Sequence, residues 1–211
     1  MAILKQICRI CPRVMALTPS TMLALGSPLP DFDLPQVTVG RLNSQSLVER
    51  PVLLMVLCAH CPFVKHVEPE ITRLDHDFSN AVQLIGVSSN SLITHPQDGP
   101  EQLADQARHN GWNFPYLLDE QQTLARALRA ACTPEFYLFA PQTNGLQTLR
   151  YRGQLDGSRP SNDVPLNGID LRAALDAVLK GDPVNPDQTA SMGCNVKWNP
   201  GQEPEWLSRS A

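Results

Sequence analysis

The residues of this sequence that are best suited to do chemistry are its six cysteines. They are Cys8, Cys11, Cys58, Cys61, Cys132 and Cys194. An even number of cysteines can form a disulfide framework, but that interpretation applies to short secreted chains, and this chain has 211 residues. In a reducing compartment, closely spaced cysteines instead indicate redox chemistry or metal binding.

Cys58 and Cys61 stand where a continuous apolar run gives way to an amphipathic pattern. Residues 52–57 are all apolar, which is typical of a strand buried on both faces. Residues 63–78 repeat apolar side chains at steps of three and four, which predicts a helix. The free N–H groups and the dipole at the start of such a helix favour a thiolate, which is the attacking species in disulfide exchange.

The spacing of this pair also suits a reversible disulfide. Two cysteines separated by two residues in a helical turn can be joined without unfolding the chain around them, and His60 between them would stabilise a neighbouring thiolate. We therefore expect dithiol–disulfide chemistry at Cys58 and Cys61. Two other interpretations stay open: buried structural cysteines, or a metal site, although the pair supplies only two of the four ligands usual for structural zinc.

The rest of the sequence predicts the elements that would hold the dithiol. Strands are expected at 52–57, 82–87, 115–118, 136–139 and 149–152, with a turn at Asn144-Gly145 before the last. Helices are expected at 63–78, between Pro100 and Gly111, after an Asp119 cap, and between an Asp170 cap and Gly181. Strands that alternate with helices predict an α/β sandwich with a mostly parallel sheet and right-handed crossovers.

Composition and charge argue against several classes of protein. Apolar residues make up 42% of the chain, enough to bury a core. The net charge of −4, with no basic run, argues against nucleic-acid binding. No stretch approaches the ~20 consecutive apolar residues that span a bilayer. Pro19 and polar residues interrupt the apolar residues near the N-terminus, so we expect no signal peptide, no membrane partner and a cytoplasmic location.

Three segments resemble the redoxin branch of the thioredoxin superfamily, which includes peroxiredoxins of the alkyl hydroperoxide reductase and thiol-specific antioxidant type. They are Gly26–Leu34, the strand that ends in Cys-x-x-Cys, and Thr133–Phe136. The similarity covers about residues 24–180. The sequence Gly193–Trp198 also resembles an uncharacterised peroxiredoxin-like subgroup. The resemblance implies a thioredoxin-like three-layer sandwich with an N-terminal hairpin extension and an irregular C-terminal tail.

The resemblance further implies that Thr133-Pro134 is a cis-proline element facing the dithiol. Such a bond would expose the backbone of Thr133 beside the cysteines, where a substrate chain could pair with it while a mixed disulfide forms. The domain would cover residues 15–182, preceded by a non-catalytic extension over 1–14 and followed by a proline-rich tail over 183–211.

The chain departs from both better-known members of this superfamily. A peroxiredoxin places its attacking cysteine after Pro-x-x-x-Thr-x-x and commonly before proline. Cys61-Pro62 matches the second feature, but Cys58 and Leu54 stand at the threonine and proline positions, and the expected arginine has no clear match. Relative to thioredoxin, the tryptophan before the dithiol is Leu57 and the buried aspartate is Val52.

These departures favour a specialised thiol–disulfide oxidoreductase that acts on a protein or small-molecule disulfide. Its electron donor would be a thioredoxin or glutathione system, and no cofactor or metal is expected. The alternative within enzymes is an antioxidant thiol peroxidase in which Cys61 attacks a hydroperoxide. Outside enzymes, the alternatives are a redox sensor or a copper carrier that uses Cys58, Cys61 and either His60 or Cys194.

Two further cysteines could join the chemistry. Cys132 directly precedes Thr133-Pro134 and could resolve a disulfide or simply pack in the core. Cys194 lies in the predicted tail. If that tail folds back, Cys194 could pair with Cys132 or Cys61 as a resolving thiol.

Overall fold

The computed structural model describes residues 17–143 and 145–207. The extension predicted over residues 1–14, with Cys8 and Cys11, lies outside these described residues. Within the described part of the chain, no helix combines the length and the apolar character needed to cross a membrane.

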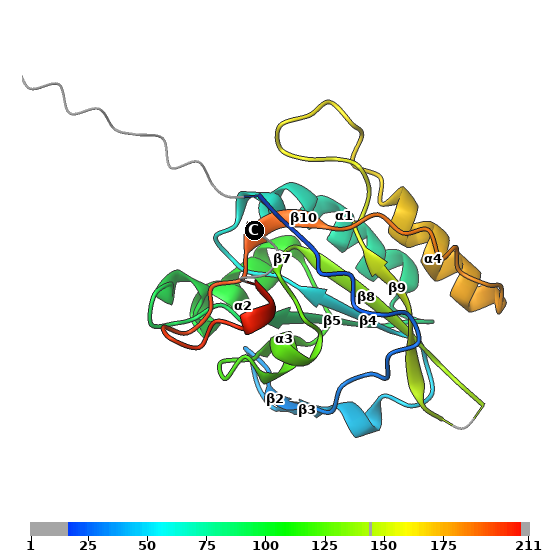
Figure 1. Ribbon diagram of the computed structural model, residues 1–211, viewed down its shortest axis with the longest axis horizontal. Coiled ribbons are helices and arrows are strands. Elements are labelled where there is room, and N and C mark those ends of the chain that lie inside the picture. The colour runs from blue at the N-terminus through cyan, green and yellow to red at the C-terminus, as the bar shows by residue number, and fades with distance from the viewer. Residues whose placement is uncertain (1–16, 144, 208–211) are drawn as a thin grey trace, which may run out of the picture.

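A five-stranded sheet forms the centre of the molecule (Figure 1). In spatial order its strands are β6 (Tyr116–Leu118), β5 (Gln83–Ser88), β4 (Val52–Val56), β8 (Glu135–Pro141) and β9 (Gln147–Gly153). β4, β5 and β6 pair in parallel, whereas β8 pairs antiparallel with both β4 and β9. All strands except β8 therefore run in one direction, which confirms the mostly parallel sheet.

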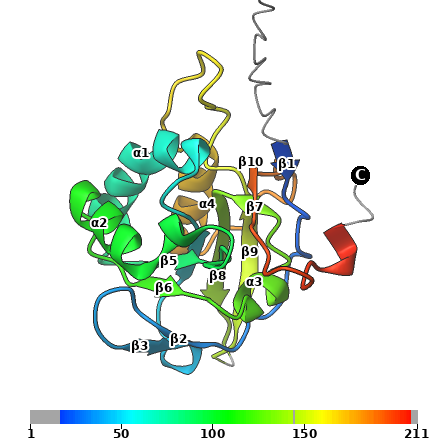
Figure 2. The ribbon, with the colours of Figure 1, turned by 90° about the vertical axis from the view of Figure 1, so that its left-hand side faces the viewer.

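Helices and a hairpin cover the two faces of this sheet (Figure 2). The core on one face is closed by α1 (Pro62–Phe78), α2 (Pro100–Asn110) and α4 (Ile169–Lys180). The core on the other face is closed by α3 (Thr123–Ala127) and the hairpin of β2 (Asp33–Pro35) and β3 (Arg41–Asn43). Successive residues of β4 alternate between the two cores, as expected for a strand buried on both sides. The three-layer sandwich and its N-terminal hairpin are confirmed.

Helix α1 follows the predicted amphipathic pattern, except that two of its acidic residues, Glu70 and Asp75, are buried. Its apolar residues Val64, Val67, Ile71 and Leu74 are buried against the sheet, as expected. Glu70 is fully buried, although a charged side chain in an amphipathic helix usually faces solvent. Its carboxylate lies 2.6 Å from Arg172 Nε on α4 and also pairs with Arg73, and these partners offset the cost of burying the charge.

Replacing Glu70 by alanine should therefore destabilise the fold by about 3 kcal/mol, because it leaves the guanidinium of Arg172 without its buried partner. Chemical denaturation monitored by circular dichroism measures the change. The matched control is Glu49→Ala, at an exposed position, where we expect a change within about 0.5 kcal/mol. Equal losses in the two variants would contradict a structural role for the buried pair.

The two predicted aspartate caps stand close to helix starts, but neither is the cap residue. Helix α3 begins after Gln122, and the Asp119 carboxylate accepts hydrogen bonds from the backbone N–H groups of Leu124 and Ala125. Helix α4 begins after Gly168, so Asp170 lies in its first turn and instead accepts from the side chain of Gln154. The predicted C-terminal ends of α2 and α4 are confirmed, because Gly111 and Gly181 adopt left-handed conformations there.

The C-terminal segment is more ordered than the irregular tail predicted over 183–211. It contains β10 (Met192–Asn195) and a short 3-10 helix (Glu205–Leu207). β10 is the central strand of a second sheet, between β1 (Leu17–Pro19) and β7 (Cys132–Thr133), and Figure 2 shows the three strands side by side. The four residues of β10 carry no alternating apolar pattern, so its partners rather than its sequence define it as a strand.

Candidate active site

The predicted dithiol lies at the junction between β4 and α1. Cys61 is the N-cap residue of α1, in an extended conformation (φ −72°, ψ 125°), and Pro62 follows in the first turn. Cys58 lies two residues beyond the end of β4, at the carboxyl edge of the sheet where chemistry collects in α/β folds. Both residues are 0% exposed, so a substrate reaches either sulfur only after a covering segment moves.

The environment of Cys61 strongly favours its thiolate. Its Sγ lies 2.8 Å from Cys194 Sγ and 3.4 Å from the backbone oxygen of Thr133, to which the protonated thiol can donate. Hydrogen bonds from Cys194 and Cys58, together with a backbone N–H bond at Val64, outweigh the effect of burial and lower the pKa of Cys61 to about 2. Cys61 therefore carries the negative charge of the site.

Cys58 and Cys194 are the protonated neighbours of that thiolate. Burial is the main cause that raises the pKa of Cys58, with a further contribution from its hydrogen bond to Cys61. The hydrogen bond to Cys61 is the main cause that raises the pKa of Cys194, followed by burial. Three sulfurs thus share one negative charge, centred on Cys61. Of the two partners considered for Cys194, Cys132 and Cys61, the structure places it against Cys61.

His60 points toward a buried carboxylate that the sequence did not indicate. Its Nδ1 lies 2.6 Å from Oδ2 of Asp98, a fully buried residue at the end of the 3-10 helix Pro96–Asp98. The other carboxylate oxygen accepts from the backbone N–H groups of Ala59 and His60. Burial would raise the pKa of Asp98, but the hydrogen bonds from His60 and Asn90 outweigh it and the pKa is lowered. Asp98 therefore fixes the loop between the two cysteines.

The Thr133-Pro134 peptide bond is cis, as the resemblance implied, and it faces the dithiol. Thr133 contacts both cysteines: its Oγ1 lies 3.5 Å from Cys58 Sγ, and its carbonyl oxygen lies near Cys61. The segment before it is held by the buried Glu135, which accepts hydrogen bonds from the backbone of Ala131 and from Ser20. Thr133 is thereby positioned between the two sulfurs.

Cys132 occupies a different environment from the other three described cysteines. Its side chain is fully buried, and its Sγ lies 3.8 Å from a carboxylate oxygen of Glu135 and 3.9 Å from the carbonyl oxygen of Pro134. Burial and the charge of Glu135 raise the pKa of Cys132 well above its ordinary value. These contacts favour the packing interpretation of Cys132 over a role as a resolving thiol.

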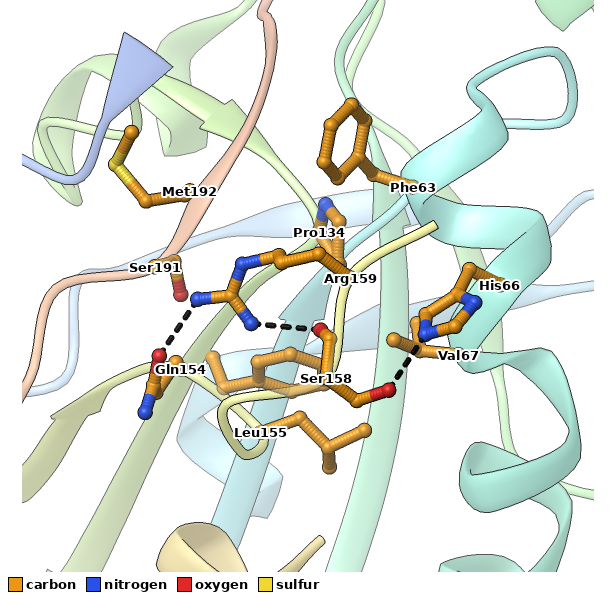
Figure 3. Close-up of a pocket in the computed structure, with 11 residues that line it drawn as sticks. Phe63, His66, Val67, Pro134, Gln154, Leu155, Ser158, Arg159, Ser191 and Met192 are labelled. Carbon is orange, nitrogen blue, oxygen red and sulfur yellow. Dashed lines mark hydrogen bonds between the residues drawn. The ribbon is translucent and has the colours of Figure 1, made fainter. Parts of the chain in front are cut away.

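A small pocket of about 20 Å³, partly open to solvent, lies beside the cis-proline (Figure 3). Phe63, Pro134 and Met192 line it, and each lies within two residues of Cys61, Thr133 or Cys194. Figure 3 shows the side chain of Arg159 lying across its middle, hydrogen-bonded to Gln154 and to the backbone of Ser158. The pocket combines an apolar lining with one guanidinium group.

Several residues that shape this site have no counterpart among the residues predicted from the sequence. Asp98 and Gln106 lie 38 and 48 residues from the loop positions that they hydrogen-bond, and Arg159 lies beyond the last strand of the sheet. None of them belongs to a local motif with the cysteines. Glu135 is the one residue whose sequence position pointed to such a role. It begins an otherwise apolar strand, and a carboxylate is costly to bury there unless a partner binds it.

One group of side chains in the described part of the chain could offer three ligand atoms to a metal ion. Cys58, His60 and Asp98 place these atoms within 4.8 Å of one another. However, His60 and Asp98 already bond to each other, and Asp98 also holds the backbone of the Cys58–Cys61 loop. A metal there would have to replace contacts that the fold uses.

Comparisons with known proteins identify the family and the fold. The AhpC/TSA family model matches residues 25–152. An uncharacterized conserved protein from Geobacillus kaustophilus is 42% identical in sequence, with a TM-score of 0.83, and the match covers 89% of this chain and 98% of that one. A hypothetical protein from Sinorhizobium meliloti is 34% identical, with a TM-score of 0.83 and coverage of 87% and 100%.

A more distant structure shares the fold. A putative thiol:disulfide interchange protein DsbE from Chlorobium tepidum is 17% identical, with a TM-score of 0.58 and coverage of 74% of this chain and 99% of that one. No curated protein sequence matches the chain. The family match and the shared fold support a thiol redox function. The chain belongs to the AhpC/TSA family, a redoxin family of the thioredoxin-like superfamily.

Proposed function

We propose that this protein is a thiol–disulfide oxidoreductase in which Cys61 is the attacking thiolate and Cys58 is its resolving partner. The observation that carries the proposal is the position of Cys61 as the N-cap residue of α1, where hydrogen bonds from the protonated thiols of Cys194 and Cys58 lower its pKa to about 2. A thiolate is the species that attacks a disulfide, so this sulfur is ready to react at neutral pH.

The exchange proceeds in two steps. The Cys61 thiolate attacks one sulfur of the substrate disulfide, which forms a mixed disulfide and releases the other substrate sulfur as a thiolate. Cys58 then loses its proton to that leaving thiolate and attacks Cys61 Sγ. The Cys58–Cys61 disulfide forms, the second substrate sulfur leaves as a thiolate that takes a proton from water, and the substrate has gained the two electrons. A thioredoxin or glutathione donor would return electrons by the reverse steps.

The other residues of the site position these sulfurs. Asp98 and His60 hold the backbone between the cysteines, and Pro62 fixes the first turn of α1. Thr133 contacts both sulfurs from the opposite side, and Pro134 joins it to the pocket. Asp98 adds a negative charge that disfavours ionisation of Cys58, which concentrates the charge on Cys61.

The test is a redox titration in glutathione buffers, with thiol trapping and peptide mass spectrometry to locate the disulfide. We expect a Cys58–Cys61 disulfide that titrates as a two-electron couple. The Cys132→Ser variant, which alters a buried cysteine outside the proposed exchange, should titrate like the wild type. Free Cys58 and Cys61 across the whole range of glutathione potentials would contradict the proposal.

The family match favours one second candidate, a thiol peroxidase in which the Cys61 thiolate attacks a hydroperoxide. The sequence offered no matching arginine, but the structure places Arg159 in the pocket beside Pro134, where its guanidinium could stabilise the developing charge. Stoichiometric peroxide added to the reduced protein separates the candidates. Rapid sulfenic acid formation at Cys61 supports the peroxidase, whereas an unchanged thiol supports disulfide exchange alone.

A further inference from the structure

The backbone edge beside the cis-proline is already occupied by the protein's own C-terminal strand. β10 pairs antiparallel with β7, and the register places Cys194 opposite Thr133. Thr133 is the residue whose backbone a substrate chain would use while its sulfur reacts at the dithiol. β10, which lies beside β7 in Figure 2, therefore lies where a bound peptide would lie, and its register places a cysteine opposite Thr133.

The sulfur of that cysteine is in direct contact with Cys61. The two Sγ atoms are 2.8 Å apart, which compares with about 2.05 Å in a disulfide bond. Cys194 is 7% exposed, whereas Cys58 and Cys61 are 0% exposed, so it is the outermost of the three sulfurs. A small movement of the Cys194 side chain would bring it to bonding distance.

The sequence of β10 is adapted to this close approach. A side chain on Gly193 would place its Cβ only 2.1 Å from the carbonyl oxygen of Thr133, so only glycine allows β10 to pair at this distance. Residues that follow the strand hold it in place: Val196 donates its N–H to the carbonyl of Ala131, and Lys197 donates its N–H to the side chain of Asn90. The strand is thus fixed at both its centre and its end.

We propose that β10 is a built-in substrate strand and that Cys194 exchanges with the Cys58–Cys61 disulfide to form a Cys61–Cys194 disulfide. In this step the Cys194 thiolate attacks Cys61 Sγ, the bond between Cys58 and Cys61 breaks, and Cys58 leaves as a thiolate. The proton that Cys194 loses passes to Cys58, so no electrons enter or leave the protein. This inference rests on the proposed dithiol function, which supplies the first disulfide.

The exchange would move the disulfide from the buried pair to the outermost sulfur. Cys58 becomes a thiol again in its buried site, where the protonated form is favoured. The new disulfide joins β10 to α1 and lies next to the pocket lined by Phe63, Pro134 and Met192. A thiol donor would meet the new disulfide at Cys194, the sulfur nearest the surface, while β10 keeps longer peptides away from Thr133.

The test maps disulfides after oxidation with glutathione disulfide in the Cys58→Ser variant. We expect a Cys61–Cys194 disulfide and a drop in alkylation of Cys194 by about tenfold or more, because adjacent thiols in one chain have a high effective concentration. Gly193→Ala in the same background should suppress this disulfide by displacing β10. The matched control is Gly157→Ala, where an added Cβ makes only an ordinary contact.

The outcomes separate this inference from the proposed function. A glutathione adduct that persists on Cys61 beside a freely alkylated Cys194 would overturn the inference, even if the wild type still forms Cys58–Cys61. A second outcome is a Cys61–Cys194 disulfide in the variant together with no Cys58–Cys61 disulfide in the wild type. That result would overturn the exchange step and the proposed function. It would leave the contact between Cys61 and Cys194 intact.

Discussion

The Cys61→Ser variant should lose disulfide exchange, with the rate of reduction of a small-molecule disulfide falling about 10³-fold or more, as is usual when an attacking nucleophile is removed. A serine hydroxyl stays protonated at neutral pH, so the attacking anion is absent. Stopped-flow measurement of thiol release from an aromatic disulfide, with the pre-reduced protein in excess, gives the rate.

Cys132→Ser is the matched control for this loss, because Cys132 is also a fully buried cysteine near the cis-proline but contacts Glu135 rather than the dithiol. Its exchange rate should stay within about threefold of the wild type, because its sulfur contacts Glu135 and the carbonyl oxygen of Pro134 and neither sulfur of the dithiol. Comparable losses of exchange rate in both variants would indicate that substitution of any buried cysteine in this region lowers the rate by disturbing the fold. That result would contradict the role given to Cys61.

The second large effect concerns the pH dependence of the Cys61 thiolate. An ordinary cysteine gains its proton as the pH falls through about 8.5, whereas the pKa of Cys61 is about 2. Because the pKa is lowered, Cys61 should remain a thiolate from neutral pH down to the pH at which the protein unfolds in acid. The ultraviolet thiolate absorbance, taken as the difference between the wild type and Cys61→Ser, measures this ionisation directly and requires no access to the buried sulfur.

Cys194 supplies the largest contribution to that acidity. The Cys194→Ala variant should therefore protonate Cys61 at a higher pH than the wild type, because a hydrogen-bond donor to the thiolate is gone. Cys132→Ala should leave the titration unchanged. A thiolate signal that disappears near pH 8.5 in the wild type, as it does in a free cysteine, would contradict the shared charge among the three sulfurs.

Much of the fold and the centre of the site follow from local sequence patterns. The apolar run at 52–57 and the amphipathic pattern at 63–78 form β4 and α1, so the strand-to-helix position of Cys58 and Cys61 was predictable. Gly111 and Gly181 end their helices because they alone adopt left-handed conformations there at little cost. The resemblance to redoxins, rather than any local rule, gave the cis peptide bond before Pro134.

The remainder depends on contacts between distant segments. β10 is short and irregular in pattern, so nothing local shows that it folds back between β1 and β7. Glu70 is a charged residue of a kind that usually faces solvent, and its pairing with Arg73 and with Arg172 on α4 explains its burial. Asp98 likewise gains its role from the loop that it contacts 38 residues away. Hydrophobic periodicity predicts which face of a helix or strand is buried. The distant residues that contact that face are determined by the tertiary fold.

The most direct test of the account is to identify the sulfur that reacts first with a disulfide. In the Cys58→Ser/Cys194→Ser double variant, hydroxyl groups keep hydrogen-bond donors beside Cys61, and a mixed disulfide cannot be resolved. Treatment with a chromogenic aromatic disulfide at neutral pH, followed by peptide mass spectrometry, should find the adduct on Cys61. An unmodified Cys61, or an adduct on Cys132 in its place, would contradict the central claim.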